Sequence, residues 1–262
     1  MVSLRHFALL GASLAIAAPA AAKPLFSVWT LEEVGPVGAV DAEFGTPFLV
    51  QRLLPYKLVQ LSGDAQLHGK GTIASQTYLF AVFQSDGQVA YCTAKDQSLG
   101  NVSKSMFIPA LDKRPCLVDA DDDGRFEASF GVFDKYGSAL TPSGNLSSAK
   151  PLKLPVAYEK LEPRQFPFVR QFDYALAGSK DPLKTRIDVR YDNGSGFKPM
   201  VNDSRRDSPT TPTALNVGAT IERIVGDRAQ ITIAVKPDLV VVGESGGSFG
   251  TGPIPDFVEK AP

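Results

Sequence analysis

Apolar side chains recur at every second position in several stretches of this chain, and this period constrains the fold more than any other feature. Residues 126–132 alternate in this way, and residues 187–191 repeat the pattern. Successive side chains of a β-strand point to opposite faces, so each stretch places its apolar side chains on one face of a sheet. The 3.6-residue period of an amphipathic helix is almost absent, and 20 prolines and 23 glycines leave little room for long helices.

Turn sequences separate these segments and indicate how they pair. Ser85-Asp86-Gly87 follows one apolar segment and precedes another, and Gly226-Asp227 does the same later in the chain. Such pairs supply the positive φ angles of tight hairpin turns. Parallel strands would need connecting helices, which the pattern does not offer. The sequence therefore predicts an all-β, antiparallel, β-sandwich-like fold, with a barrel as the alternative.

The number of domains is open at this level. Residues 141–151 are polar and rich in Ser, Gly and Pro, which is typical either of a linker between two β domains or of a long loop in one large domain. The corresponding division is a β-sandwich region over residues 23–148 and a second β region over residues 149–243. Residues 244–262 are rich in Gly and Pro, which predicts a flexible tail.

The first 22 residues have the three parts of a cleavable export signal. Arg5 and His6 precede an apolar run from Phe7 to Ala18, and a small-residue segment ends at Ala22. The run is shorter than the about 20 residues of a membrane-spanning helix, so we expect cleavage and not a retained anchor. We therefore expect a soluble mature protein in the periplasm or outside the cell, with no membrane span.

Charge and cysteine content narrow the function further. The formal net charge of −1 provides no basic surface for nucleic acid. Cys92 and Cys116 both follow the signal, and export would carry them into an oxidising compartment. The sequence therefore predicts a disulfide between them, with two buried free thiols as the alternative.

The segment Asp119-Ala120-Asp121-Asp122-Asp123-Gly124-Arg125-Phe126-Glu127 is the sharpest chemical motif. It resembles the first half of an EF-hand or dockerin-type calcium loop, in which a glycine at position 6 turns the chain and lets the acidic residues converge. The resemblance ends after nine residues, because Phe130 stands where that pattern has a bidentate glutamate. The alternative is an Asp-rich hairpin turn. The resemblance implies a weak calcium site with these ligands: side-chain oxygens of Asp119, Asp121 and Asp123, the carbonyl of Arg125, and an oxygen of Glu127 that binds directly or through water.

Gly243-Glu244-Ser245-Gly246-Gly247 has the Gly-x-Ser-x-Gly spacing of a hydrolase nucleophile and is similar to the serine motif of trypsin-like proteases. An α/β-hydrolase needs a helix and a histidine downstream, and no histidine follows this segment. His68, the only histidine after the signal, lacks the flanking residues of a protease histidine. We therefore expect no serine-hydrolase site, and we place His68 on the surface or in a turn.

Three functions remain as hypotheses, with a non-catalytic role favoured over an enzyme. The first is an exported binding or cell-envelope structural protein that is stabilised by calcium and has a glycan or an envelope protein as its partner. The second is a calcium-assisted carbohydrate-binding module, and the third is a glycoside hydrolase using two carboxylates. Sugar stacking would need exposed aromatics, whereas core packing would bury them. The aromatic residues concerned are Phe26, Trp29, Tyr158, Phe166, Phe168, Phe172 and Tyr174.

We predict that the mature protein begins at Lys23, because Ala20-Ala21-Ala22 forms the small-residue cleavage site. The intact mass of the exported protein measures this directly. Recovery of a chain that retains residues 1–22 in the membrane fraction would contradict the cleavage and the predicted compartment together.

Overall fold

A computed structural model describes residues 25–69, 71–94, 113–134, 142–178, 185–192, 200–201, 210–237, 239–245 and 248–259. These residues form strands β1 to β20 with little helix, and every named strand pair is antiparallel, which confirms the all-β antiparallel fold. The predicted export signal lies outside the described residues. In the described ranges, no helix has both the length and the hydrophobicity that crossing a membrane requires.

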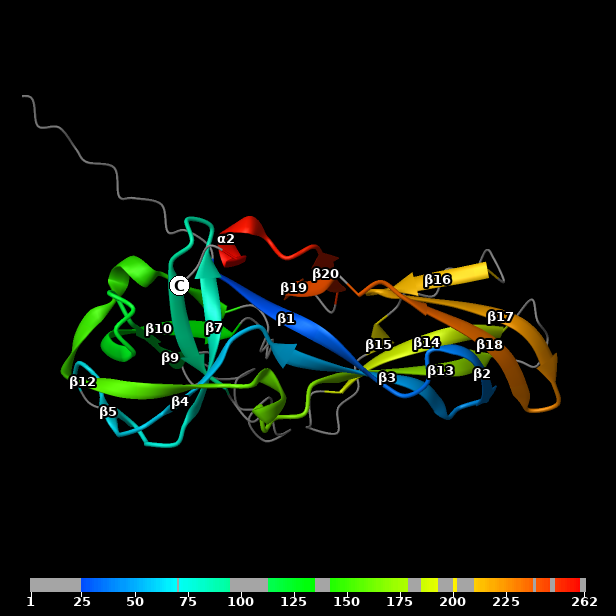
Figure 1. The fold of residues 1–262 in the computed structure, drawn as a ribbon, viewed down its shortest axis with the longest axis horizontal. Coiled ribbons are helices and arrows are strands. Elements are labelled where there is room, and N and C mark those ends of the chain that lie inside the picture. Colours follow the sequence, from blue (N-terminus) through cyan, green and yellow to red (C-terminus); the bar gives the residue numbers. More distant parts are fainter. Residues whose placement is uncertain are drawn as a thin grey trace, which may run out of the picture.

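Six strands close into a barrel at one end of the molecule (Figure 1). The ring runs β7, β4, β12, β10, β9 and β8, and pairing between β8 and β7 closes it. All six strands contribute buried side chains to one apolar cluster. Because the ring is closed, these strands have no unpaired sheet edge. The strands are β4 (Leu58–Leu61), β7 (Tyr78–Gln84), β8 (Val89–Thr93), β9 (Lys113–Val118), β10 (Arg125–Asp134) and β12 (Lys150–Leu161).

Two further sheets pack against each other at the opposite end (Figure 1). One contains β3 (Pro47–Pro55), β13 (Gln171–Gly178), β14 (Thr185–Asp192) and β15 (Met200–Val201). Through β1 this sheet continues to β19 (Val240–Ser245) and β20 (Ser248–Gly252), which lie between the two ends in Figure 1. The other contains β16 (Thr210–Ala214), β17 (Val217–Val225), β18 (Arg228–Val235) and β2 (Gly38–Glu43). Alternate residues of β18, Ala229, Ile231 and Ile233, are buried between the sheets, so this end has the sandwich arrangement that the period-two pattern predicts.

Strand β1 (Leu25–Val34) belongs to both parts. Its first residues, 25–27, pair with β7 of the barrel, and residues 29–34 pair with β3. Trp29 lies where these pairings meet and is 1% exposed. The remaining short elements are β5 (Ala65–Gln66), β6 (Thr72–Ile73), β11 (Pro142–Gly144), η3 (Leu146–Ser148), η4 (Pro163–Gln165) and α2 (Asp256–Glu259).

Strand pairing crosses the predicted domain division at residues 148 and 149. Strand β12 lies between β4 and β10, and β13 pairs with β3, so strands on both sides of that division form the same sheet. The division in space instead separates the barrel from the two packed sheets, with β1 shared between them. Sequence-distant strands contribute to each part, which local composition does not reveal.

The segment predicted as a flexible tail is ordered over its described residues. Strand β20 pairs with β19, which itself pairs with β1, and α2 packs against the barrel. Val258 is 1% exposed, and the ring of Phe257 lies 5.7 Å from that of Phe26. Burial of these apolar side chains fixes a segment whose Gly and Pro content suggested flexibility, so the tail prediction is wrong for these residues.

The predicted disulfide is present. Cys92 on β8 lies directly opposite Cys116 on β9, their sulfur atoms are bonded, and both residues are fully buried. The bond joins residues 24 positions apart and ties two neighbouring barrel strands together. It also lies just before the acidic loop that begins at Asp119.

We expect the double substitution Cys92→Ala and Cys116→Ala to lower the free energy of unfolding by about 3 to 4 kcal/mol, since a loop of this length gains chain entropy when it is opened. Urea unfolding of the oxidised wild type and of the variant measures the difference. Alkylation of denatured wild type without reductant is the control and should label neither cysteine. Labelling of both would show free thiols and remove the proposed source of stability.

Candidate cation site

The acidic loop connects β9 to β10 at the surface of the barrel. Asp122 and Gly124 both have left-handed backbone conformations, with φ angles of 55° and 86°. Gly124 adopts this conformation at little cost because it has no Cβ, and aspartate tolerates it better than most residues. These two positions curl the chain, so the acidic residues on either side of Asp122 turn toward one point.

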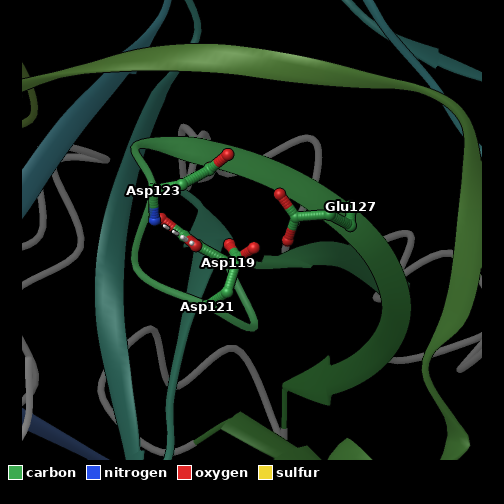
Figure 2. A group of neighbouring side chains, drawn as sticks. All are labelled: Asp119, Asp121, Asp123 and Glu127. Carbon is green, nitrogen blue, oxygen red and sulfur yellow. Dashed lines mark hydrogen bonds between the residues drawn. The ribbon is translucent and has the colours of Figure 1, made fainter.

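Four carboxylates converge in this loop. One oxygen from each of Asp119, Asp121, Asp123 and Glu127 lies within 4.8 Å of the others. Figure 2 shows these four side chains grouped in the loop. Asp119 and Glu127 are partly buried, whereas Asp121 and Asp123 are exposed. Four negative charges at this spacing repel one another, and a divalent cation among them would offset that repulsion. The structure therefore brings together all four carboxylates predicted as ligands.

Hydrogen bonds hold two of these carboxylates in place. Asp119 accepts backbone N–H bonds from Asp123 at 3.2 Å and Gly124 at 3.0 Å. It also accepts a bond from the Tyr158 hydroxyl at 2.9 Å. Glu127 accepts a bond from the backbone N–H of Ala120 at 3.0 Å. The loop is thus shaped by its own backbone and by one side chain from β12.

Asp122 stands apart from the four convergent carboxylates. One of its oxygens lies 4.0 Å from the ammonium of Lys160, and both side chains are substantially exposed. An exposed pair of this kind contributes little to stability. Asp122 nevertheless carries the same charge on the same loop as the proposed ligands, which makes it a matched position for mutagenesis.

Aromatic side chains join the loop to the barrel interior. The ring of Tyr158 stacks on that of Phe126 with centroids 4.3 Å apart, and Tyr91 packs against both. Burial, with a further contribution from Asp122 and then Asp119, raises the pKa of Tyr91 to about 12. Burial and the hydrogen bond to Asp119 also raise the pKa of Tyr158, so its hydroxyl stays protonated and remains a donor.

The pKa of Glu127 reflects both its partial burial and the negative charges around it. Its pKa is raised above the ordinary value of 4.5 by partial burial, and then by the nearby charges of Asp119, Asp121 and Asp123. The hydrogen bond from Ala120 opposes this effect by favouring the ionised form. A cation in the loop would also favour the ionised form of Glu127 and so lower its pKa.

The carbonyl oxygen of Arg125 is also predicted to bind the calcium ion, and this assignment stays a prediction. The structure places Arg125 at the start of β10 opposite Ala157. Its backbone N–H donates to Asp123 at 2.8 Å, and its guanidinium donates to the carbonyl of Pro155 at 3.3 Å. The role of Tyr158 was not predicted, because it lies 39 residues from Asp119 and no local pattern connects them.

The other candidate residues take structural positions. His68 is exposed in the connection between β5 and β6, as expected for a turn histidine. Ser245 ends β19 and pairs with Ser248 of the antiparallel strand β20, whereas a hydrolase nucleophile stands at a turn from a strand into a helix. Of the aromatics considered for sugar stacking, Trp29, Phe166, Phe172 and Tyr174 are buried in the core.

Comparisons with known proteins add no functional assignment. No protein-family model, curated protein or solved structure matches this chain.

We expect Glu127→Gln to stabilise the calcium-free protein more at about pH 7 than at about pH 4. The pKa of Glu127 is higher in the folded state than its ordinary value of 4.5, so the free energy of unfolding falls as pH rises from 4.5 through the folded-state pKa. Glutamine does not ionise, so it removes that loss, and its side-chain oxygen can still accept the hydrogen bond from Ala120. Urea unfolding without calcium at both pH values measures the effect. Glu159→Gln on β12 removes one charge outside the cluster as a control, and an equal gain at both pH values for Glu127→Gln would contradict the explanation.

Proposed function

We propose that residues 119–127 bind calcium and that the chain is an exported, non-catalytic β protein with a binding or cell-envelope structural role. The observation that carries this proposal is the convergence of four carboxylates within 4.8 Å on a loop shaped by its own backbone hydrogen bonds. The bound cation stiffens the connection between β9 and β10 at the surface of the barrel.

Calcium suits this arrangement better than a softer metal. It takes six to eight hard oxygen ligands in flexible geometry, and carboxylates, carbonyls and water can supply them. Four carboxylates provide part of that set, and the Arg125 carbonyl and solvent would complete it. Because Phe130 replaces the bidentate glutamate and two ligands are exposed, we expect weak binding, at about 10⁻⁴ to 10⁻³ M.

Export is supported by two independent features. The first 22 residues have the form of a cleavable signal. The Cys92–Cys116 disulfide also fits an oxidising compartment such as the periplasm or the extracellular space. Extracellular calcium reaches concentrations at which a weak site of this class fills.

A binding or structural role fits the rigid position of the acidic loop between two strands of the barrel. The barrel and the disulfide fix the strands on either side of it, so a bound cation would present a rigid polar surface to a glycan or an envelope protein. The pairing of Ser245 with β20 and the turn position of His68 support this role over a serine-hydrolase activity.

We expect calcium to raise the melting temperature of the wild type and a chelator to reverse the rise. At a free calcium concentration 100 times the dissociation constant, binding to the folded state adds about 2.7 kcal/mol to stability. The double variant Asp121→Ala and Asp123→Ala should lose this response because it lacks two ligands. Thermal unfolding over a calcium titration measures the response.

The control variant removes two negative charges, as the Asp121→Ala and Asp123→Ala variant does, but it removes no proposed ligand. The double variant Asp122→Asn and Glu159→Gln loses two negative charges near the loop but keeps all four convergent carboxylates, so it should keep most of the calcium response. A wild type whose melting does not change up to about 10 mM calcium contradicts the proposal, since that exceeds the expected dissociation constant. Equal responses in the two double variants would also contradict it.

A further inference from the structure

A second site lies on the outer side of β1 and β3, remote in sequence from the acidic loop. Residues 162–170 cross these strands before β13 begins, and a pocket of about 140 Å³ opens beneath them. Within the crossing, the backbone N–H of Glu162 donates to the side chain of Gln165 at 2.9 Å at the start of η4. At its end, the backbone N–H of Leu53 on β3 donates to the carbonyl of Arg170 at 2.8 Å.

The pocket carries more positive than negative charge. Arg52, Arg164 and Glu32 line its mouth, and Glu32 pairs with Arg164 at 2.7 Å. Arg52 lies between Glu32 and Gln171 across the sheet, and it belongs to none of the ion pairs found between described residues. Arg170 is almost fully buried and already donates to the carbonyl of Val169, so we give it no ligand role.

The wall of the pocket is apolar and anchored in the core. Phe166 packs against Trp29 with ring centroids 5.5 Å apart, and Phe168 packs edge-on against Phe166 at 5.4 Å. Both phenylalanines line the pocket together with Leu54. An apolar cavity of roughly 150 Å³ holds a benzene molecule, so this volume suits a ligand of about six heavy atoms.

We propose that this pocket binds a small organic carboxylate. A guanidinium presents a planar set of donors that matches the two oxygens of a carboxylate, and the phenylalanine wall would cover a short apolar body. Arg52, which forms no ion pair among the described residues, provides the guanidinium for the ligand. Glu32 occupies Arg164 as a competing carboxylate, so its removal frees a second guanidinium for the ligand. The proposal is independent of the cation site.

The test is a titration of the full mature chain with isobutyrate, followed by backbone amide chemical shifts. We expect saturable shifts centred on residues 164–171. Arg52→Gln should weaken binding about tenfold, because it removes a charge-assisted contact. Glu32→Gln should tighten binding severalfold, whereas a purely structural Glu32–Arg164 pair would give weaker or unchanged binding when it is broken.

Controls separate charge from shape. Isobutanol has the same branched body without the charge and should not saturate the pocket. Inorganic phosphate has the charge without the apolar body and should bind more weakly than isobutyrate. Arg223→Gln removes an exposed arginine on β17 of the other sheet and should leave binding unchanged. The proposal is overturned by shifts that do not saturate by about 50 mM, by shifts located elsewhere, or by equal binding of wild type and Arg52→Gln.

Discussion

The burial of Trp29 in β1 is the interaction on which the rest of the structure depends. Its ring packs against Phe80 of the barrel and against Phe166 of the crossing segment, and its indole N–H donates to Ser27 at 3.0 Å. Removing a buried aromatic side chain of this size costs about 3 to 5 kcal/mol, a large share of the stability of one domain. One side chain therefore holds together the strand shared by the barrel and the packed sheets.

The two proposed sites use this framework in different ways. The acidic loop is connected to the buried Phe126 through Tyr158, whose partly buried ring stacks on Phe126 and whose hydroxyl donates to Asp119. The pocket under residues 162–170 takes its wall from Phe166, which packs against Trp29. In both cases an aromatic residue that contacts the buried core fixes a polar surface feature. Such support keeps ligand groups in place before any ligand arrives, which lowers the entropic cost of binding.

Local sequence patterns predicted the features that depend on neighbouring residues. The period-two alternation predicted strands because side-chain direction in a strand is a local property. The spacing of Asp119, Asp121, Asp123 and Glu127 predicted their convergence because Gly124 turns the chain within the same few residues. The pairing of Cys92 with Cys116 followed from there being only two cysteines in a chain expected to be exported.

Tertiary structure alone decided which strands are neighbours and what lies beneath the sites. Burial of Val258 and the packing of Phe257 against Phe26 ordered a segment whose composition suggested a flexible tail, because a hydrophobic contact depends on distant partners. The period-two pattern places Phe126 and Phe130 on the same face of a strand, but the two side chains pack in different apolar clusters. A register shift between Phe126 and Ala128 in the pairing of β10 with β12 explains the difference. The bond from Tyr158 to Asp119 and the meeting of Arg52 with Arg164 also join residues far apart in the chain. The sequence by itself determined the strands and the acidic loop, and only packing determined how distant residues meet to form the barrel and the second pocket.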